Sequence, residues 1–241
     1  MAVKISFDQV SDLGQSARGE LFTLLERHFA GVEGDTFATD LLAKTHVLRL
    51  FGQDGNLAGF STIDYRRRMI DGVRAAVLYS GDTIVDPAAW VDASLGPAWV
   101  AAVLDLHAEQ GPLWWLVLTS GMRTYRYLTV CLCRYAPAPP DRYDVTAAAL
   151  LSVLASERFG ESFNAHTGVV RFVNPQCLRH HLADVPEHIR DDPAVQVFLQ
   201  RNPGHAAGDE LVSVCRLDVA NLTPAGLLAL RRGRRAAVGA S

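Results

Sequence analysis

The sequence predicts an α+β fold in which helices flank a mixed, mostly antiparallel central sheet. Apolar residues recur at helical spacing in several stretches, and short strand-like runs separated by turn residues follow one another in the first half. A nearly all-apolar run then follows a long helical segment. With 241 residues, 49% of them hydrophobic, the chain is long enough to bury a sizeable core.

The first half predicts two helices, three strands, a helix, a strand and a helix. Asp54-Gly55 and the polar stretch from Tyr65 to Gly72 would be the turns of an antiparallel meander. The run Leu-Trp-Trp-Leu-Val-Leu-Thr at 113–119 is typical of a strand buried on both faces. Helices are expected over 15–32, 36–43, 95–106 and 122–135, and strands over 46–51, 57–63, 73–85 and 113–119.

A proline-rich segment at 136–140 is the predicted boundary between a core, residues 1–137, and a C-terminal extension, residues 138–241. We expect the extension to be largely helical and to pack on the core, where it closes a cleft or serves packing or homodimer formation. Its helices are expected over 145–159, 175–182 and 194–200 and from Thr223-Pro224 onward, with strands over 169–173 and 210–217.

The composition limits the classes of molecule that we expect the protein to bind. The net charge of -3 predicts attraction neither to nucleic acid nor to a membrane surface. The four cysteines form no C-x-x-C pair, and no group of histidines and cysteines has metal-ligand spacing, so we expect reduced thiols and no metal. The N-terminus has no apolar signal core, and we expect a cytoplasmic protein.

The stretch from 77 to 106 carries the functional prediction. It reads Leu-Tyr-Ser-Gly-Asp-Thr-Ile-Val at 78–85, Trp-Val-Asp-Ala-Ser-Leu at 90–95, and then a long amphipathic helix. Together with the order of elements, these residues resemble the GCN5-related N-acetyltransferase (GNAT) superfamily over roughly residues 22–137. The resemblance implies acyl transfer from a thioester to an amine.

The resemblance also implies where a donor would bind. In that superfamily the strand before the central helix carries a bulge whose backbone amides pair with the pantetheine arm, and Gly81 stands where such a bulge would fall. The next strand, 113–119 here, would splay away from it. The implied co-substrate is acyl-CoA or acyl-phosphopantetheine, with no covalently bound cofactor. Its predicted contacts are Ser80, Gly81, Thr83, Ile84, Val85 and Ser94.

Three residues are candidates for the chemistry. Asp82 could act as the base for the amine, or it could cap the following turn. A tyrosine on the helix after the splayed strand would be the acid, which suggests Tyr125 or Tyr127. They lie two residues apart, so at most one faces the cleft; alternatively, these aromatic side chains pack in the core or on the surface. Trp114 or Trp115 could shape a pocket for the acyl group.

The segment that corresponds to the pyrophosphate loop of the superfamily, residues 89–94, departs from the family's glycine-containing motif. Residues 89–94 contain no glycine, and Asp92 would repel a phosphate. Three outcomes fit this departure: a donor held by its pantetheine arm, such as an acyl carrier protein thioester; weak CoA binding; or no acyl transfer. The hypotheses are therefore an acyltransferase acting on a small-molecule amine and, alternatively, a non-catalytic ligand-binding or regulatory module of the same shape.

Overall fold

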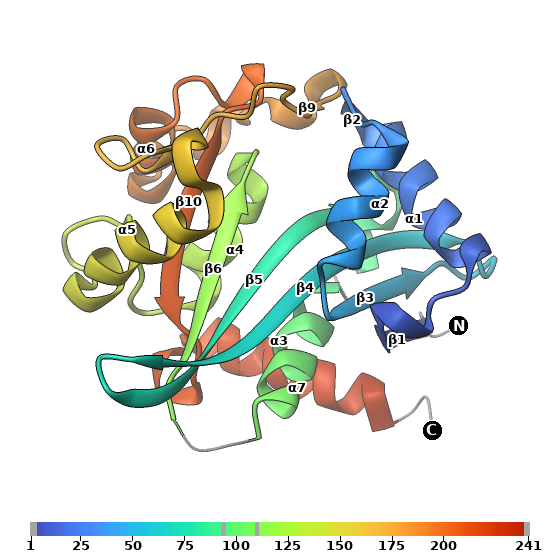
Figure 1. Cartoon of the computed structure of the whole chain (residues 1–241), viewed down its shortest axis with the longest axis horizontal. Coiled ribbons are helices and arrows are strands. Elements are labelled where there is room, and N and C mark those ends of the chain that lie inside the picture. Colours follow the sequence, from blue (N-terminus) through green and yellow to red (C-terminus); the bar gives the residue numbers. More distant parts are fainter. Residues whose placement is uncertain (1–3, 93–94, 109–110, 239–241) are drawn as a thin grey trace.

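The computed structural model describes residues 4–92, 95–108 and 111–238. Within them, eight strands form one sheet in the order β1-β3-β4-β5-β6-β10-β8-β7 (Figure 1). Neighbouring strands pair antiparallel except β5 and β6, which are parallel, so the predicted fold class is confirmed. The strands are β1 (Lys4–Gln9), β3 (His46–Phe51), β4 (Leu57–Ile70), β5 (Val73–Val85), β6 (Leu113–Thr119), β7 (Phe163–Asn164), β8 (Val169–Val170) and β10 (Glu210–Arg216).

Helices cover both faces of this sheet. On one face, α3, α4, α6 and α7 enclose the largest apolar cluster, with α3 packed along α7. On the other face, α5 packs over β5, β6 and β10, and α1 and α2 pack over β3 and β4 (Figure 1). The helices are α1 (Gln15–His28), α2 (Gly34–Leu42), α3 (Leu95–Leu106), α4 (Met122–Cys131), α5 (Val145–Phe159), α6 (Pro193–Arg201) and α7 (Pro224–Val238). None of the described helices is both long and apolar enough to cross a bilayer.

The predicted β4 was too short. It continues through Arg66, Arg67 and Arg68, which were expected in a turn, and pairs with β5 as far as Ile70 opposite Val73. Only Asp71 and Gly72 form the turn, with φ of 49° and 77°, the positive values that a two-residue hairpin needs. Arginines are tolerated here because this end of the hairpin is exposed, and Arg68 pairs with Glu157 of α5.

Other differences come from pairings between distant segments. The strand β1 was not predicted, although it lies along β3 at the sheet edge. The helix expected over 175–182 is wrong: this segment holds the short strand β9 (Cys177–Leu178), which pairs with β2 (Phe29–Ala30) of the N-terminal region. The helix expected over 122–135 ends at Cys131, because Leu132 is extended and bridges to Leu222.

The C-terminal part shares the sheet with the first half. Strand β10 pairs along β6 from Leu211 opposite Thr119 to Arg216 opposite Trp114, and α7 packs on α3. Residues 138–241 thus contain strands as well as helices. The domain division at residue 137 stays a prediction.

Candidate functional site

Two neighbouring strands separate at the centre of the sheet. The parallel pairing of β5 and β6 begins at Ala76 and Leu113 and ends at Ser80 and Val117. Beyond that point β5 stays with β4, and β6 stays with β10. In the described residues, the edge of β5 after Ser80 therefore faces an opening in place of another strand.

The bulge predicted at Gly81 is present at the start of this opening. Ser61 pairs with Thr83 and Ile63 pairs with Ser80, so Gly81 and Asp82 together lie opposite Thr62. A Cβ at Gly81 would lie 2.8 Å from Lys44 Cε and 2.8 Å from Thr62 Oγ1. A larger residue at this position would therefore displace the Lys44 or the Thr62 side chain.

The opening leads into a cavity of about 840 Å³. Its walls come from the end of β5, the start of α3, one side of α4, α2 and the segment 172–178. The predicted residues that line it are Ser80, Gly81, Asp82, Thr83, Ile84, Val85 and Tyr127. Ser94 lies outside the described residues.

A tryptophan fixes the point where the strands part. Trp115 of β6 donates from Nε1 to Ser80 Oγ at 2.9 Å, and its ring packs on Trp99 of α3 with 4.3 Å between centroids. Both rings line the cavity on the α3 side of the sheet. Trp114 points to the opposite face and packs under α5, so of the two it is Trp115 that shapes the pocket.

Tyr127 is the tyrosine of α4 that reaches the cavity. Its ring packs against Gly96 in the first turn of α3, where a Cβ would lie 2.5 Å from Tyr127 Cε2. The hydroxyl oxygen is buried next to the Cys131 thiol, and no hydrogen-bond partner lies in acceptable geometry among the described residues. Burial raises the pKa of this hydroxyl well above its ordinary value, so it stays protonated at neutral pH.

The structure does not bring Tyr125 to the site. Its side chain is fully buried in the core, packs against Tyr135 and Phe198, and donates from its hydroxyl to the Pro137 carbonyl at 2.8 Å. Two residues along a helix turn the side chain to another face, which is why only one of the two tyrosines lines the cavity.

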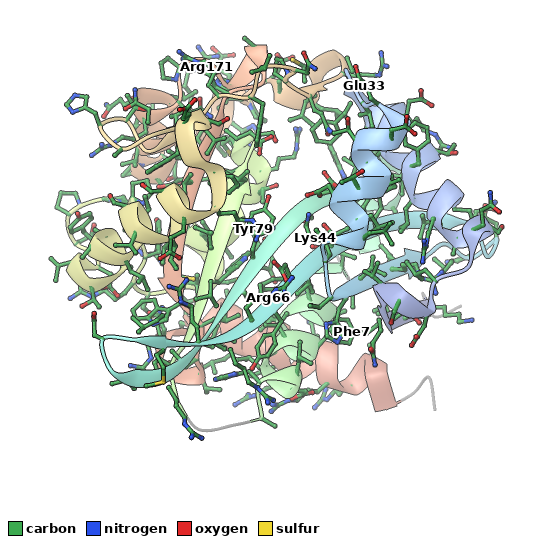
Figure 2. The ribbon with its side chains drawn as sticks, in the orientation of Figure 1. Phe7, Glu33, Lys44, Arg66, Tyr79 and Arg171 are labelled. Carbon is green, nitrogen blue, oxygen red and sulfur yellow. The ribbon has the colours of Figure 1, made fainter. Side chains whose placement is uncertain are left out.

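Asp82 presents a free carboxyl on the α2 side of the sheet. It is half-buried against the cavity, and among the described residues it makes no hydrogen bond and no ion pair. Burial raises its pKa from 3.8 to about 6; the Asp40 carboxylate raises it further, and the Lys44 ammonium lowers it. Lys44 is itself buried and pairs with Asp40, and its Nζ lies 5.4 Å from the Tyr79 ring (Figure 2).

A second carboxyl that we did not predict lies across the opening. Glu210 is the first residue of β10 and lines the same cavity, as does Ser120. Burial and the nearby Asp82 charge raise its pKa to about 8. The only signal in the sequence was one acidic residue at the start of an otherwise apolar strand, which by itself does not indicate a site.

Two side chains, Trp90 and Arg123, stack at the wall of the cavity near the start of α3. Residues Pro87–Asp92 form a 3-10 helix, and Trp90 donates from Nε1 to the Val85 carbonyl at 3.0 Å. The Arg123 guanidinium lies over the Trp90 ring, 4.4 Å from its centroid, and donates to the Leu182 carbonyl at 2.9 Å. This wall thus has an indole and a guanidinium where a phosphate-binding loop would expose its backbone.

A main-chain bridge crosses one end of the cavity. The short strands β2 and β9 lie side by side (Figure 1) and pair Phe29 with Leu178. Both residues line the cavity. Arg179 strengthens this β2–β9 bridge: its backbone N–H donates to the His28 carbonyl at 2.7 Å, and its Nε donates to the Phe29 carbonyl at 2.9 Å. The N-terminal region and the C-terminal part therefore meet above the opening.

The arrangement suits acid–base chemistry at a buried, organic substrate. It combines a free carboxyl, a second carboxyl that holds its proton and a free strand edge in one mostly apolar cavity, and the ring of Tyr127 forms part of the wall, with its hydroxyl buried. In the described part of the chain, no three side chains of His, Cys, Asp or Glu are placed to hold a metal ion.

No protein-family model matches the chain, and no curated protein matches its sequence. Solved structures that resemble it include a probable N-acyltransferase from Enterococcus faecalis (12% identity, TM-score 0.42, 56% of this chain and 33% of that one). An acyl-CoA N-acyltransferase from Pseudomonas aeruginosa has 17% identity and a TM-score of 0.40 over 52% of this chain and 87% of that one. A GNAT family N-acetyltransferase from Escherichia coli, in complex with CoA, has 13% identity and a TM-score of 0.38 over 53% of this chain and 69% of that one.

The chain spans about a third of the length of the enterococcal protein. The mostly antiparallel sheet covered by helices is the architecture that the sequence predicted. At these identities and TM-scores the likenesses assign neither a family nor an activity.

Proposed function

We propose that the protein is an acyltransferase that moves an acyl group from a thioester donor, acyl-CoA or acyl-phosphopantetheine, to the amine of a small molecule. The observation that carries this proposal is the glycine bulge at the point where two parallel strands part. It opens into a cavity that has a free carboxyl on one side of the sheet and the Tyr127 ring on the other, with the unpartnered Tyr127 hydroxyl buried behind that wall.

The donor would lie along the free edge of β5. Its pantetheine arm would pair with the backbone beyond Ser80, and backbone N–H groups from Gly81 to Thr83 would polarise the thioester carbonyl. Trp115 and Trp99 would form the floor on the α3 side. This places the sulfur toward Tyr127 and the carbonyl carbon near the bulge.

The acceptor amine would approach from the Asp82 side. Asp82 takes a proton from the amine, whose nitrogen attacks the thioester carbonyl carbon; the carbon–sulfur bond then breaks. Tyr127 gives its hydroxyl proton to the departing thiolate. The pKa directions suit these roles, because Asp82 is ionised above pH 6 while the Tyr127 phenol keeps its proton.

The region before α3 indicates how the donor is held. With Trp90 and Arg123 filling this wall, most of the binding energy would come from the pantetheine arm and little from backbone contacts to phosphates. A donor attached to an acyl carrier protein fits this arrangement as well as a free acyl-CoA does.

Binding and turnover test the proposal together. We expect CoA thioesters or pantetheine thioesters at 100 times their Kd to stabilise the protein by about 2.7 kcal/mol, a rise in melting temperature of roughly 5–10 °C. Thiol release in the presence of amines then reports transfer. Glu20→Gln, an exposed change on α1, is the matched control. If no thioester shifts the melting temperature and none releases thiol, the protein is not an acyltransferase.

One observation favours the alternative of a non-catalytic binding module. The loop before α3 has no glycine that would let backbone amides approach a phosphate closely. Stabilisation by thioesters without thiol release, over a broad panel of amines, would support that alternative.

A further inference from the structure

We propose that the acceptor is a small, positively charged amine held between Asp82 and Glu210 beneath the β2–β9 bridge, and that Glu210 determines this specificity. This inference rests on the proposed function, because it names the second substrate of that reaction.

The first observation is the free carboxyl of Asp82. It is enclosed by protein apart from the cavity, yet no described side chain donates to it. An ionised carboxyl in such surroundings is unfavourable unless a cation or a hydrogen-bond donor meets it. The Lys44 ammonium lowers the pKa of Asp82 but is paired with Asp40, so the side of Asp82 that faces the cavity is left open to a ligand that brings an ammonium group.

The second observation is the position of Glu210 on the opposite side. Asp82 belongs to β5 and Glu210 to β10, and the separation of β5 from β6 places the two carboxyls across the opening. Ser120 lines the cavity beside Glu210 and lowers the pKa of its carboxyl. A ligand that enters the opening therefore meets a carboxyl from each side.

The basic side chains near Asp82 and Glu210 are paired with other carboxylates. Lys44 is paired with Asp40, and Arg158, whose guanidinium carbon lies 3.6 Å from the Tyr79 ring centroid, is paired with Asp64 at 3.0 Å. Neither basic group pairs with Asp82 or Glu210. An ammonium between these two carboxyls would lower the pKa of both and favour their ionised forms, which adds to its affinity.

The third observation concerns size. The β2–β9 bridge closes one end of the cavity by main-chain pairing, and Phe29 and Leu178 project from it into the cavity. An extended peptide needs a groove that is open at both ends. The bridge therefore favours a compact amine over a protein N-terminus or a lysine within a chain.

Steady-state kinetics with three acceptor types tests the inference, with whichever thioester stabilises the full-length protein as donor. The acceptors are a short alkyl diamine, an aromatic amine that is uncharged at pH 7.5, and a tripeptide with a free N-terminus. We expect the diamine to have the highest kcat/KM. Glu210→Gln should raise the KM for the diamine by about 10-fold or more, the loss expected for one charge-assisted hydrogen bond. The KM for the donor should stay unchanged, and Glu210→Asp should restore part of the loss because it keeps the charge.

The outcomes separate the two proposals. Thiol release with the peptide or the neutral amine as the best acceptor, or an unchanged diamine KM in Glu210→Gln, overturns the inference and leaves the acyltransferase standing. A donor KM that rises together with the diamine KM in Glu210→Gln would mean that Glu210 acts only on the fold, and this also overturns it. No thioester binding and no thiol release with any acceptor would remove the proposed function and the inference together.

Discussion

Replacing Asp82 by asparagine should stabilise the protein at neutral pH while abolishing turnover. The pKa of Asp82 is raised from 3.8 to about 6 in the folded protein, so the folded state holds this proton more tightly than the unfolded chain. The stability that the protonated carboxyl contributes is fully present below about pH 4 and is lost as the pH rises to 6. A shift of about two units corresponds to about 3 kcal/mol, because each unit is worth about 1.4 kcal/mol.

Asparagine has nearly the same shape and cannot ionise, so Asp82→Asn should escape this loss. We expect its free energy of unfolding to exceed that of the unchanged protein by about 2–3 kcal/mol at pH 7.5 and by almost nothing at pH 4. Urea unfolding at both pH values measures the difference, and thiol release measures the loss of activity. Asp35→Asn, an exposed change on α2, should show no such dependence on pH. A destabilised Asp82→Asn protein at pH 7.5, or a gain that is equal at both pH values, would refute the reasoning.

Two further substitutions address the other walls of the cavity. Tyr127→Phe should lower kcat by about 100-fold or more with little change in the free energy of unfolding, because the Tyr127 hydroxyl has no hydrogen-bond partner to lose. Tyr125→Phe should lower the free energy of unfolding by about 1 kcal/mol and keep turnover, because it loses the hydrogen bond to the Pro137 carbonyl. Thiol release and urea unfolding measure both variants, and loss of activity in Tyr125→Phe alone would reverse the assignment of the acid. Gly81→Ala should destabilise the protein by about 1–3 kcal/mol and abolish turnover, because its Cβ would press on the Lys44 side chain. Gly19→Ala, where a Cβ meets open space on α1, is its control, and a fully active Gly81→Ala protein would contradict the role of the bulge.

Local patterns were enough to predict the half of the site that lies on β5. The resemblance to the GNAT superfamily implied a bulge at Gly81, a glycine inside an apolar strand, and the register of β4 and β5 confirms the bulge there. An all-apolar run predicted β6 as a strand buried on both faces, with its bounds unchanged. Because Tyr125 and Tyr127 lie two residues apart on a helix, the sequence predicted that their side chains face different directions. It could not tell which of the two reaches the cavity.

The other half of the site depends on pairings between residues far apart in the sequence. Glu210 reaches the cavity only because β10 joins the sheet beside β6, and the β2–β9 bridge pairs Phe29 with Leu178. Periodicity within a window reports the local conformation and carries no information on which distant strand becomes a neighbour. The sequence predicted a turn at the exposed arginines of β4 for the same reason: they are extended because they pair with β5, and the local pattern does not report that pairing.

The position of β10 in the sheet has a consequence for how the molecule is made. During synthesis β6, whose side chains are all buried in the finished protein, emerges long before the strand that covers its second edge. Until β10 arrives, this apolar edge can pair with other chains, which is a recognised cause of aggregation. The late strand therefore protects the nascent chain at the same moment at which it delivers Glu210 to the cavity, so the protein cannot expose a complete cavity before its most vulnerable edge is covered.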